Sequence, residues 1–306
     1  MIPRITVVGS IRADLSMWVK RHPHPGETVL GTGGTISPGG KGANQAVAAA
    51  LQGAGVAFVG AIGNDAYAFN ATALMVDAGV VMTGVEKRGD ATGLAVITVA
   101  EDGENTTVVL PGANSWVTES YVNLHADIVR NAEIVLLQGE IPASGFEAAV
   151  RHSVGRVVVN LAPVIPVARE LLFRADPLLA NEHEAARLLE YLGCPSAGVP
   201  DIVSQPERMA QELLDAGFRS VVITLGPQGA MVATEDGVEH VPTPPVTPVD
   251  TTGAGDAFTG ALVARLAEGS SLRDAAFHAC RVAAYTVTGY GAQSSYPAAN
   301  DPLPEL

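Results

Sequence analysis

The stretch VDTTGAGDAFTGAL, residues 249–262, places a carboxylate, Asp256, directly after the run Gly253-Ala254-Gly255. The apolar residues that follow repeat at helical spacing, so the sequence predicts a helix that begins in this run. The N-terminus of a helix exposes free backbone N–H groups and attracts anions. Asp256 therefore either caps the helix, which is a common role for Asp, or takes part in chemistry beside a bound anion. The remainder of the chain distinguishes these two roles.

The bulk composition indicates a folded protein with an acidic surface. Of its 306 residues, 47% are hydrophobic, which is enough for a sizeable core. The net charge of -14 disfavours nucleic acid and anionic membranes as partners. The uncharged stretch 42–64 is long enough to span a bilayer, but its polar residues favour a buried helix followed by a buried strand. Two cysteines, Cys194 and Cys280, and an N-terminus without a signal-peptide pattern predict a cytoplasmic protein.

Strand-like runs alternate with Ala- and Leu-rich helical segments along most of the chain. Continuous apolar strands between helices are typical of a parallel sheet that is covered on both faces. The sequence therefore predicts a three-layer α/β/α fold with a mostly parallel central sheet. The predicted strands are 5–9, 56–62, 132–138, 156–162 and 220–226, and the predicted helices are 43–51, 66–79, 144–153, 182–192 and 207–217, with two more between 253 and 289.

A second group of short strands has no helices between its members. They are predicted at 15–19, 28–36, 92–100 and 106–112 and form a separate small sheet, which suggests a lid over a site. We expect a single domain over residues 1–306, with the lid inserted from about 12–36 and 92–112. Because a small apolar sheet is rarely stable with one face bare, we also expect a homodimer that pairs through the lid.

Two segments near the N-terminus carry residues suited to a ligand. Gly39, Gly40 and Gly42, in SPGGKGANQAVAAAL (37–51), let the backbone approach a ligand closely or form a structural turn. Their spacing does not match a Walker A loop. Asp14 lies just past the first strand, where open α/β sheets bind ligands, although it can equally be a turn residue.

Two segments in the second half also carry polar groups at the start of an element. Asn181 and Glu184, in LLANEHEAARL (178–189), are three apart and can form a capping box or hold a hydrated Mg²⁺ near phosphates. The run TLGPQGA (224–230) follows a strand and is either an ordinary turn or a ligand loop. Each of these segments alone leaves both interpretations open.

Taken in order, the segments resemble the ribokinase family of carbohydrate kinases, from about Ile5 to Pro297. GGKGANQAVAAA (39–50) is similar to the family's N-terminal signature, and DTTGAGD (250–256) is similar to its C-terminal signature. The resemblance implies a ribokinase-like α/β fold with a lid and ATP-dependent phosphorylation of a sugar primary hydroxyl. D-ribose is the leading substrate, with D-ribose 5-phosphate as its product, and ATP, Mg²⁺ and K⁺ are the implied cofactors. Further matches in the expected order are GEN (103–105), PGAN (111–114), NLAP (160–163) and NEHEA (181–185).

The resemblance also implies roles for single residues. Asp256 is implied as the catalytic base, and the N–H groups of Gly253, Ala254 and Gly255 are implied as the anion hole for the transferring phosphoryl. The other implied contacts are Arg12, Asp14, Gly40, Lys41, Gly42, Asn44 and Glu140 to the sugar; Asn181, Thr224, Gly226, Gly229, Gly255 and Cys280 to ATP; Glu184 to Mg²⁺, through water; and Asp250, Thr252, Thr286, Gly289, Gly291 and Ser295 around an activating K⁺.

Arg12 is the main departure from the family pattern, because it stands where the family usually presents Asn. It either pairs with a nearby carboxylate such as Asp14 or Glu140, or enters the sugar pocket and binds an anionic group on the substrate. Cys280 and Ala68 depart from the pattern in ways that we expect to be tolerated. The alternatives are a kinase for another small sugar, a sugar acid or a nucleoside, and a non-catalytic sugar-binding regulatory protein. The intact Asp256 and its glycines disfavour the last.

Overall fold

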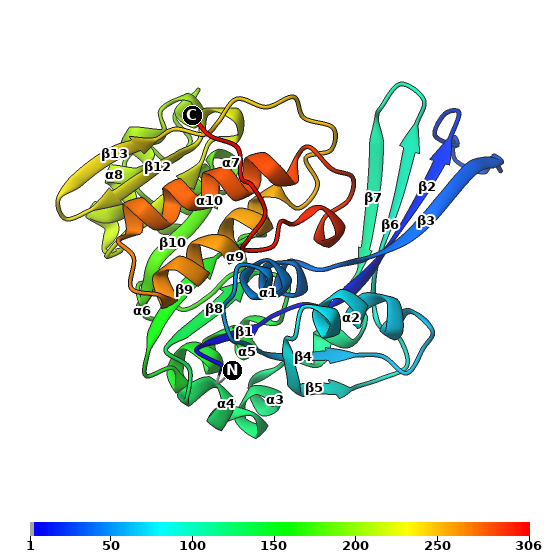
Figure 1. Cartoon of the computed structure of the whole chain (residues 1–306), viewed down its shortest axis with the longest axis horizontal. Coiled ribbons are helices and arrows are strands. Elements are labelled where there is room, and N and C mark those ends of the chain that lie inside the picture. Colours follow the sequence, from blue (N-terminus) through cyan, green and yellow to red (C-terminus); the bar gives the residue numbers. More distant parts are fainter. Residues whose placement is uncertain (1–2) are drawn as a thin grey trace.

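The computed structural model describes residues 3–306 and consists of a sheet-centred body with a small projecting sheet (Figure 1). Within these residues the body contains a nine-stranded sheet. In sheet order its strands are β13 (Gly237–Val241), β12 (Ala230–Thr234), β11 (Val221–Thr224), β10 (Ala175–Asn181), β9 (Arg156–Asn160), β8 (Ile134–Gln138), β1 (Ile5–Val8), β4 (Val56–Ile62) and β5 (Val81–Lys87).

The strands from β11 to β5 are all parallel to their neighbours, and β12 and β13 extend the sheet in antiparallel pairs. Strands such as β8, with the sequence IVLLQ, are buried along their whole length. Because successive side chains point to opposite faces, Leu136 packs into the core on one side of the sheet and Leu137 into the core on the other. The predicted three-layer α/β/α fold with a mostly parallel sheet is confirmed.

Helices cover both faces of the sheet. The first layer is α1 (Lys41–Leu51), α2 (Tyr67–Asp77), α9 (Ala254–Ala267) and α10 (Leu272–Thr286), and the second is α3 (Glu119–Leu124), α4 (Ala126–Arg130), α5 (Ala143–His152), α6 (Arg169–Leu172), α7 (Glu182–Leu192) and α8 (Pro206–Ala216). Short 3-10 helices lie at η1 (Gly112–Trp116), η2 (Ile202–Ser204), η3 (Gly226–Gln228) and η4 (Gln293–Ser295).

Helices α1 and α9 pack closely against each other where Gly260 faces Ala48. A Cβ atom added at Gly260 would lie 2.5 Å from Cβ of Ala48, so only glycine permits this approach. The uncharged stretch 42–64 falls in α1 and β4, as predicted. None of the helices formed by residues 3–306 combines the length and apolar character needed to cross a bilayer.

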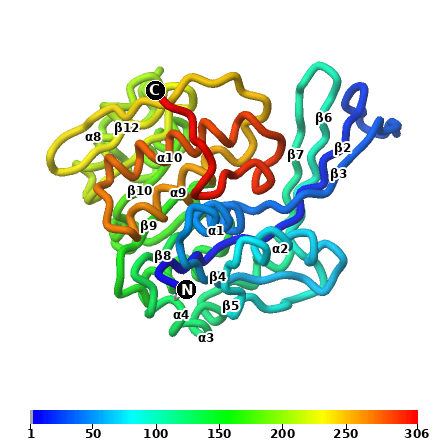
Figure 2. Tube along the Cα trace, in the orientation of Figure 1, coloured from blue at the N-terminus to red at the C-terminus, as the bar shows by residue number. Residues whose placement is uncertain are grey.

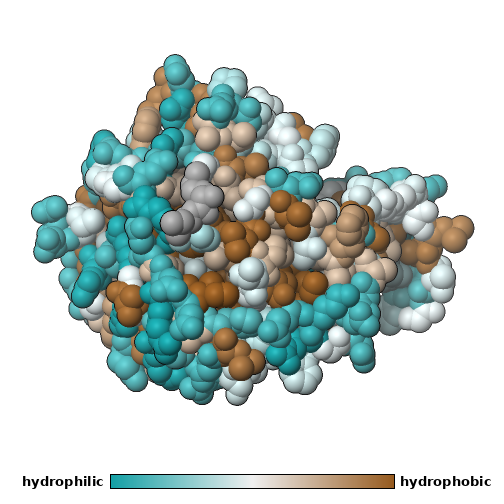
Figure 3. All heavy atoms as spheres, turned by 60° about the horizontal axis from the view of Figure 1, so that its bottom comes forward, coloured by the Kyte–Doolittle hydropathy of each residue, from teal (hydrophilic) through white to brown (hydrophobic). Residues whose placement is uncertain are grey.

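The small sheet is an arm that leaves the body at one edge. Its order is β3 (Gly31–Gly39), β2 (Arg12–Val19), β6 (Gly93–Ala100) and β7 (Asn105–Leu110). Figure 2 shows the β2–β3 and β6–β7 connections together at the far end of this arm. Strand β7 is exposed along its length and carries Val108 and Val109, and the space-filling view shows apolar atoms on the projecting arm (Figure 3).

Four strands of the large sheet, β5, β10, β12 and β13, were not among the predicted strands. Strand β10 contains Pro177, which cannot donate a ladder hydrogen bond, and its pairing with β9 shifts register between Ala175 and Leu178. Strand β13, GVEHV, is mostly exposed at the sheet edge and lacks an apolar run. The sequences of β10 and β13 therefore lack the continuous apolar run that marked the central strands.

Candidate active site

Two cavities lie beside the carboxyl ends of the central strands, on the side that faces the arm. The smaller one, of about 70 Å³, includes the last residues of β9, β10 and β11. Open α/β sheets bind ligands at this edge because the loops and helix N-termini converge there. The residues that line the smaller cavity are Lys41, Asn160, Ala162, Leu179, Ala180, Asn181, Glu184, Thr224, Gly255, Asp256 and Thr259.

Asp256 lies in the first turn of α9 and reaches across to α1. Gly253 is the N-cap of α9 and has a left-handed backbone conformation with φ 77°. Asp256 is only 8% exposed. Its Oδ2 accepts a hydrogen bond of 2.9 Å from Nδ2 of Asn44, and its Oδ1 accepts one of 2.9 Å from Nε2 of Gln45. Within residues 3–306 its hydrogen-bond partners are thus side chains of α1. The carboxylate is not used to cap its own helix.

The charge of Asp256 is balanced by several groups. Burial raises the pKa of the Asp256 carboxyl above its usual value, while Lys41 and the amides of Asn44 and Gln45 act in the opposite direction. The same attraction, mainly from Asp256, raises the pKa of the Lys41 ammonium. A buried carboxylate with a raised pKa, held beside a lysine in a cavity, has the properties of a general base.

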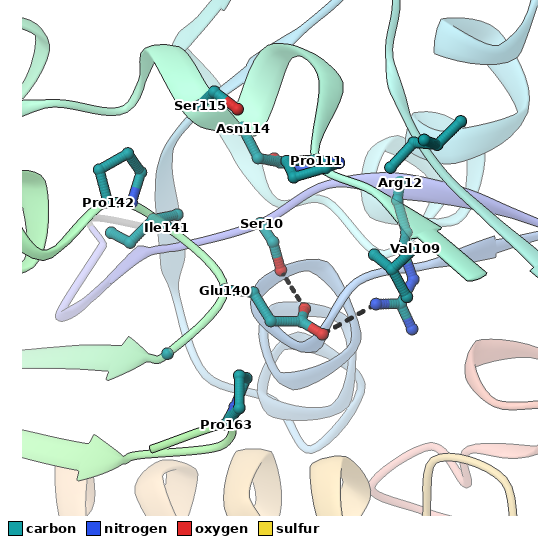
Figure 4. A pocket seen from close by; sticks show the side chains of 12 residues that line it. Ser10, Arg12, Val109, Pro111, Asn114, Ser115, Glu140, Ile141, Pro142 and Pro163 are labelled. Atoms are coloured by element: carbon teal, nitrogen blue, oxygen red, sulfur yellow. Dashed lines mark hydrogen bonds and ion pairs between the residues drawn. The ribbon is translucent and has the colours of Figure 1, made fainter. Parts of the chain in front are cut away.

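The larger cavity, of about 470 Å³, lies between the body and the start of the arm, and Arg12 and Glu140 form part of its wall (Figure 4). Nε of Arg12 lies 2.7 Å from Oδ1 of Asp14, and its Nη1 lies 2.8 Å from Oε1 of Glu140. The second oxygen of Glu140 accepts hydrogen bonds from the Ser10 hydroxyl at 2.6 Å and from the Lys41 backbone N–H at 2.8 Å.

This cluster is largely shielded from water. The side chains of Arg12, Asp14 and Glu140 are 17%, 11% and 16% exposed. Burial raises the pKa of Asp14 despite the Arg12 guanidinium. Burial also opposes the charge of Glu140, but Arg12, Ser10 and the Lys41 N–H outweigh it and lower the pKa of Glu140. The internal pairing of Arg12 that the sequence left open is therefore the arrangement in this structure.

The glycine-rich segment is shaped by the same groups. Gly40, the N-cap of α1, has φ 94°, and a Cβ there would lie 2.9 Å from the Ser10 carbonyl oxygen. Gly42 is buried and donates its backbone N–H to Oγ of Ser10. Of the predicted sugar contacts, Arg12 and Glu140 line the larger cavity and Lys41 lines the smaller one. Asp14 bonds Arg12 and Asn44 bonds Asp256, and these two residues, Gly40 and Gly42 line neither cavity.

Asn181 and Glu184 form the capping box that their spacing allows. Oδ1 of Asn181 accepts the Glu184 N–H at 2.8 Å, and Oε2 of Glu184 accepts the Asn181 N–H at 3.0 Å. Both residues also line the smaller cavity, so capping does not remove them from the site. Asn and Glu supply the oxygen ligands that suit hydrated Mg²⁺, and the donor set fits that ion.

The remaining residues predicted for ATP lie in two places, at and just after the end of β11 and within α10. Thr224 ends β11 and lines the smaller cavity, and Gly226 and Gly229 bound the short η3 turn with φ 52° and 92°. Cys280 is buried in α10 with its sulfur 4.0 Å from the Val241 carbonyl oxygen, and it lines neither cavity.

The residues predicted around K⁺ come from two loops that Asp250 ties together. Its Oδ1 accepts the Thr252 N–H at 2.9 Å and its Oδ2 accepts the Gly291 N–H at 2.8 Å. Oγ of Ser295 lies 2.7 Å from the Gly291 carbonyl oxygen, and the Thr286 carbonyl oxygen accepts the Gly289 N–H. As ligands for a cation these residues offer only oxygen atoms, which fits a hard monovalent cation.

Four buried amides beside Asp256 were not predicted as site residues. Gln45 donates to Asp256 and to Oδ1 of Asn160, Gln138 donates to Gln45, and Gln293 donates to Asn44. Gln45 directly follows a predicted contact, Asn44, but helical geometry alone does not place both side chains on one carboxylate. The sequence carried no signal for Gln138 or Gln293.

The pfkB family carbohydrate kinase model matches residues 3–299. The chain belongs to this family. It is an ATP-dependent phosphotransferase that acts on carbohydrates, and the general enzyme class predicted from the two signatures is confirmed.

Similarity to individual family members extends over almost the whole chain. Ribokinase of Bacillus subtilis strain 168 is 36% identical over 306 residues, covering 97% of each chain. Deoxyribokinase of Salmonella typhi is 33% identical over 303 residues, covering 96% of this chain and 95% of the other. The structure of Arabidopsis thaliana ribokinase complexed with ribose and ATP superposes with a TM-score of 0.87 at 34% identity, covering 98% of this chain and 97% of that one.

Proposed function

We propose that this carbohydrate kinase transfers the γ-phosphoryl group of ATP to the primary hydroxyl of D-ribose and forms D-ribose 5-phosphate. The observation that carries the proposal is the placement of Asp256 at the N-terminus of α9, inside a cavity that also contains Lys41, Asn181 and Glu184. The similarity to ribokinases over nearly the full chain supports ribose as the sugar.

In this proposal Asp256 accepts the proton of the sugar hydroxyl. The N–H groups of Gly253, Ala254 and Gly255, at the start of α9, stabilise the charge on the transferring phosphoryl. Phosphoryl transfer demands mainly positioning and charge stabilisation from the protein, so a base and an anion site must be neighbours. The adjacent Lys41 offsets the negative charge that gathers between them.

Both implied cations have fitting residues. Glu184 and Asn181 hold hydrated Mg²⁺, which neutralises the phosphates of ATP when bound. Asp250 and its oxygen-rich neighbours hold K⁺, which keeps the loop before α9 in shape. Thr224, Gly226 and Gly229 contact the nucleotide, and Cys280 lies in the helix that borders the adenine.

Ribose can bind beside Arg12 if the guanidinium stays paired with Asp14 and Glu140 as part of the pocket wall. These bonds also occupy carboxylate oxygens that a sugar would otherwise use. That observation favours, as a second candidate, a sugar with fewer hydroxyl contacts or a different acceptor of the same family. We infer further that residues 1–306 act as one domain, in the cytoplasm where ATP is supplied, and as a homodimer through the exposed arm.

The test is ADP release in the presence of ATP, Mg²⁺ and one acceptor at a time. The panel contains D-ribose, 2-deoxy-D-ribose, hexoses, sugar acids and nucleosides. The proposal requires the highest kcat/KM on D-ribose. A higher value on any other acceptor would reassign the substrate, and no ADP release with any of them would contradict a sugar kinase of this specificity.

The role of Asp256 is tested separately with Asp256→Asn. We expect turnover to fall by roughly 10²–10⁴, the usual effect of losing a general base, while the variant still folds and binds nucleotide. Turnover within tenfold of the parent would remove Asp256 from the mechanism.

A further inference from the structure

Two chains of buried amides converge on the Asp256 carboxylate from different elements. On one side Gln138, at the end of β8, donates to Oε1 of Gln45 at 2.7 Å, and Gln45 donates to Oδ1 of Asp256 at 2.9 Å. On the other side Gln293, in η4, donates to Oδ1 of Asn44 at 2.9 Å, and Asn44 donates to Oδ2 of Asp256 at 2.9 Å. Each carboxylate oxygen is therefore served by one amide that is itself held by a glutamine.

The outer glutamines reinforce the direction of these hydrogen bonds, because the ionised carboxylate can only accept and each outer glutamine donates to the carbonyl end of the inner amide. A side-chain amide has its donors on one end and its acceptor on the other. When Gln138 donates to the carbonyl oxygen of Gln45, the NH₂ group of Gln45 must face Asp256. A rotated Gln45 amide would instead point its oxygen at the carboxylate and at Oδ1 of Asn160, which already faces its NH₂ group at 2.9 Å. The same reasoning applies to Gln293 and Asn44.

The outer glutamines are not satisfied by this arrangement themselves. Gln138 and Gln293 are 0% and 4% exposed, and among residues 3–306 neither Oε1 atom has a hydrogen-bond partner. Buried acceptors without partners are rare and cost stability, so their presence calls for an explanation. Their donor groups are both directed inward, along the chain of bonds that ends at Asp256.

We propose that Gln138 and Gln293 are positioning residues that hold the amides of Gln45 and Asn44 in the orientation that donates to Asp256. The inference rests on the proposed role of Asp256 as the base. Through the two inner amides, the outer glutamines keep the carboxylate ionised and fix its rotation. Neither outer glutamine is hydrogen-bonded to Asp256.

Other charged groups also face Asp256 and remain unchanged in the test. Lys41 of α1 favours the ionised carboxylate, while Glu140 after β8 and Asp14 of β2 oppose it. The Tyr296 hydroxyl, which donates to the Gly253 carbonyl oxygen, lies nearby with a pKa raised mainly by burial. The effect of the glutamines must therefore be measured as a change against this constant background.

The experiment measures kcat/KM for the sugar against pH, at saturating ATP and Mg²⁺, for Gln138→Met and Gln293→Met. Methionine keeps the length and burial of glutamine but cannot donate to the inner amide. We expect kcat/KM at pH 7 to fall about tenfold and the acid limb of the profile to move up by about one pH unit, because the inner amide is held less firmly against Asp256 and the base protonates more easily.

The matched control is Gln52→Met. Gln52 is a buried glutamine at the other end of α1, 5% exposed, and it bonds the Pro297 carbonyl oxygen and His278 instead of the Asp256 chain. Its substitution is expected to lower the Tm and leave the acid limb at the pH of the parent.

The outcomes distinguish a failure of the positioning role from a failure of Asp256 as the proposed base. If both Gln138→Met and Gln293→Met lower the Tm as Gln52→Met does and keep the acid limb of the parent, the positioning role is overturned. Should one variant fail to fold, the other decides, because the two belong to separate elements. If Asp256→Asn retains turnover, it is the proposed base that fails. If Asp256→Asn loses turnover but the acid limb of both glutamine variants stays at the pH of the parent, only the positioning role is refuted.

Discussion

Replacing Arg12 with Asn removes the cation that bridges Asp14 and Glu140, and its effect on stability follows from the geometry. The two ion pairs span 2.7 and 2.8 Å, and none of the three side chains is more than 17% exposed. Removing one partner of a buried pair costs about 3–5 kcal/mol. Because this cluster keeps some contact with water and Lys41 remains nearby, we expect a loss of roughly 2–3 kcal/mol.

That loss converts into a measurable change in Tm. With 306 residues and about 2.1 cal/mol/K of unfolding entropy per residue, the chain has an unfolding entropy of about 0.6 kcal/mol/K. The Tm of Arg12→Asn should therefore fall by about 3–5 °C in a thermal denaturation scan at pH 7.5. Since Arg12 serves the pocket wall in the proposed function, kcat/KM for D-ribose should not rise.

Arg4→Asn is the matched control for this substitution. Arg4 pairs with Glu133 at 2.6 Å, but the two side chains are 48% and 55% exposed, so the Tm should change by no more than about 1 °C. An Arg12→Asn variant as stable as its parent would refute the bridging role. A clear rise in its kcat/KM for D-ribose would show that Arg12 obstructs ribose, and would favour a substrate with a group for the guanidinium to bind.

Three further predictions concern the cation, the arm and pH. Replacing Na⁺ with K⁺ at constant ionic strength should raise turnover through the Asp250 site, and equal rates at saturating Mg²⁺ would dismiss that site. Light scattering at micromolar concentration should give twice 31.4 kDa, and Val108→Glu on the exposed strand β7 should give the single-chain mass; a monomeric parent would count against pairing. Burial lowers the pKa of His278 to about 4 from 6.5, so its contribution to stability is present above pH 6.5 and is lost as pH falls toward 4. His278→Gln should flatten the fall of Tm across that window, and an unchanged slope would contradict the assignment.

The sequence alone determined the parts of this protein that depend on local pattern. Continuous apolar runs such as 134–138 marked the buried parallel strands because both of their faces lie in the core. The glycines before Asp256 marked the start of α9, since a left-handed N-cap at Gly253 requires glycine. The two signatures then identified the enzyme class, because they occur in the same order and at both ends of the chain.

Tertiary structure decided which polar residues meet and with whom. Asn44 and Gln45 reach Asp256 from more than 200 positions away in the sequence, and their partners Gln138 and Gln293 follow no shared spacing. The sequence also left open whether Arg12 binds its own carboxylates, because an arginine side chain can reach several groups and only the packing of β2 against the segment after β8 selects them. Local pattern reports burial and backbone shape, whereas hydrogen bonds between elements depend on distances that arise only when the sheet and both helical layers assemble.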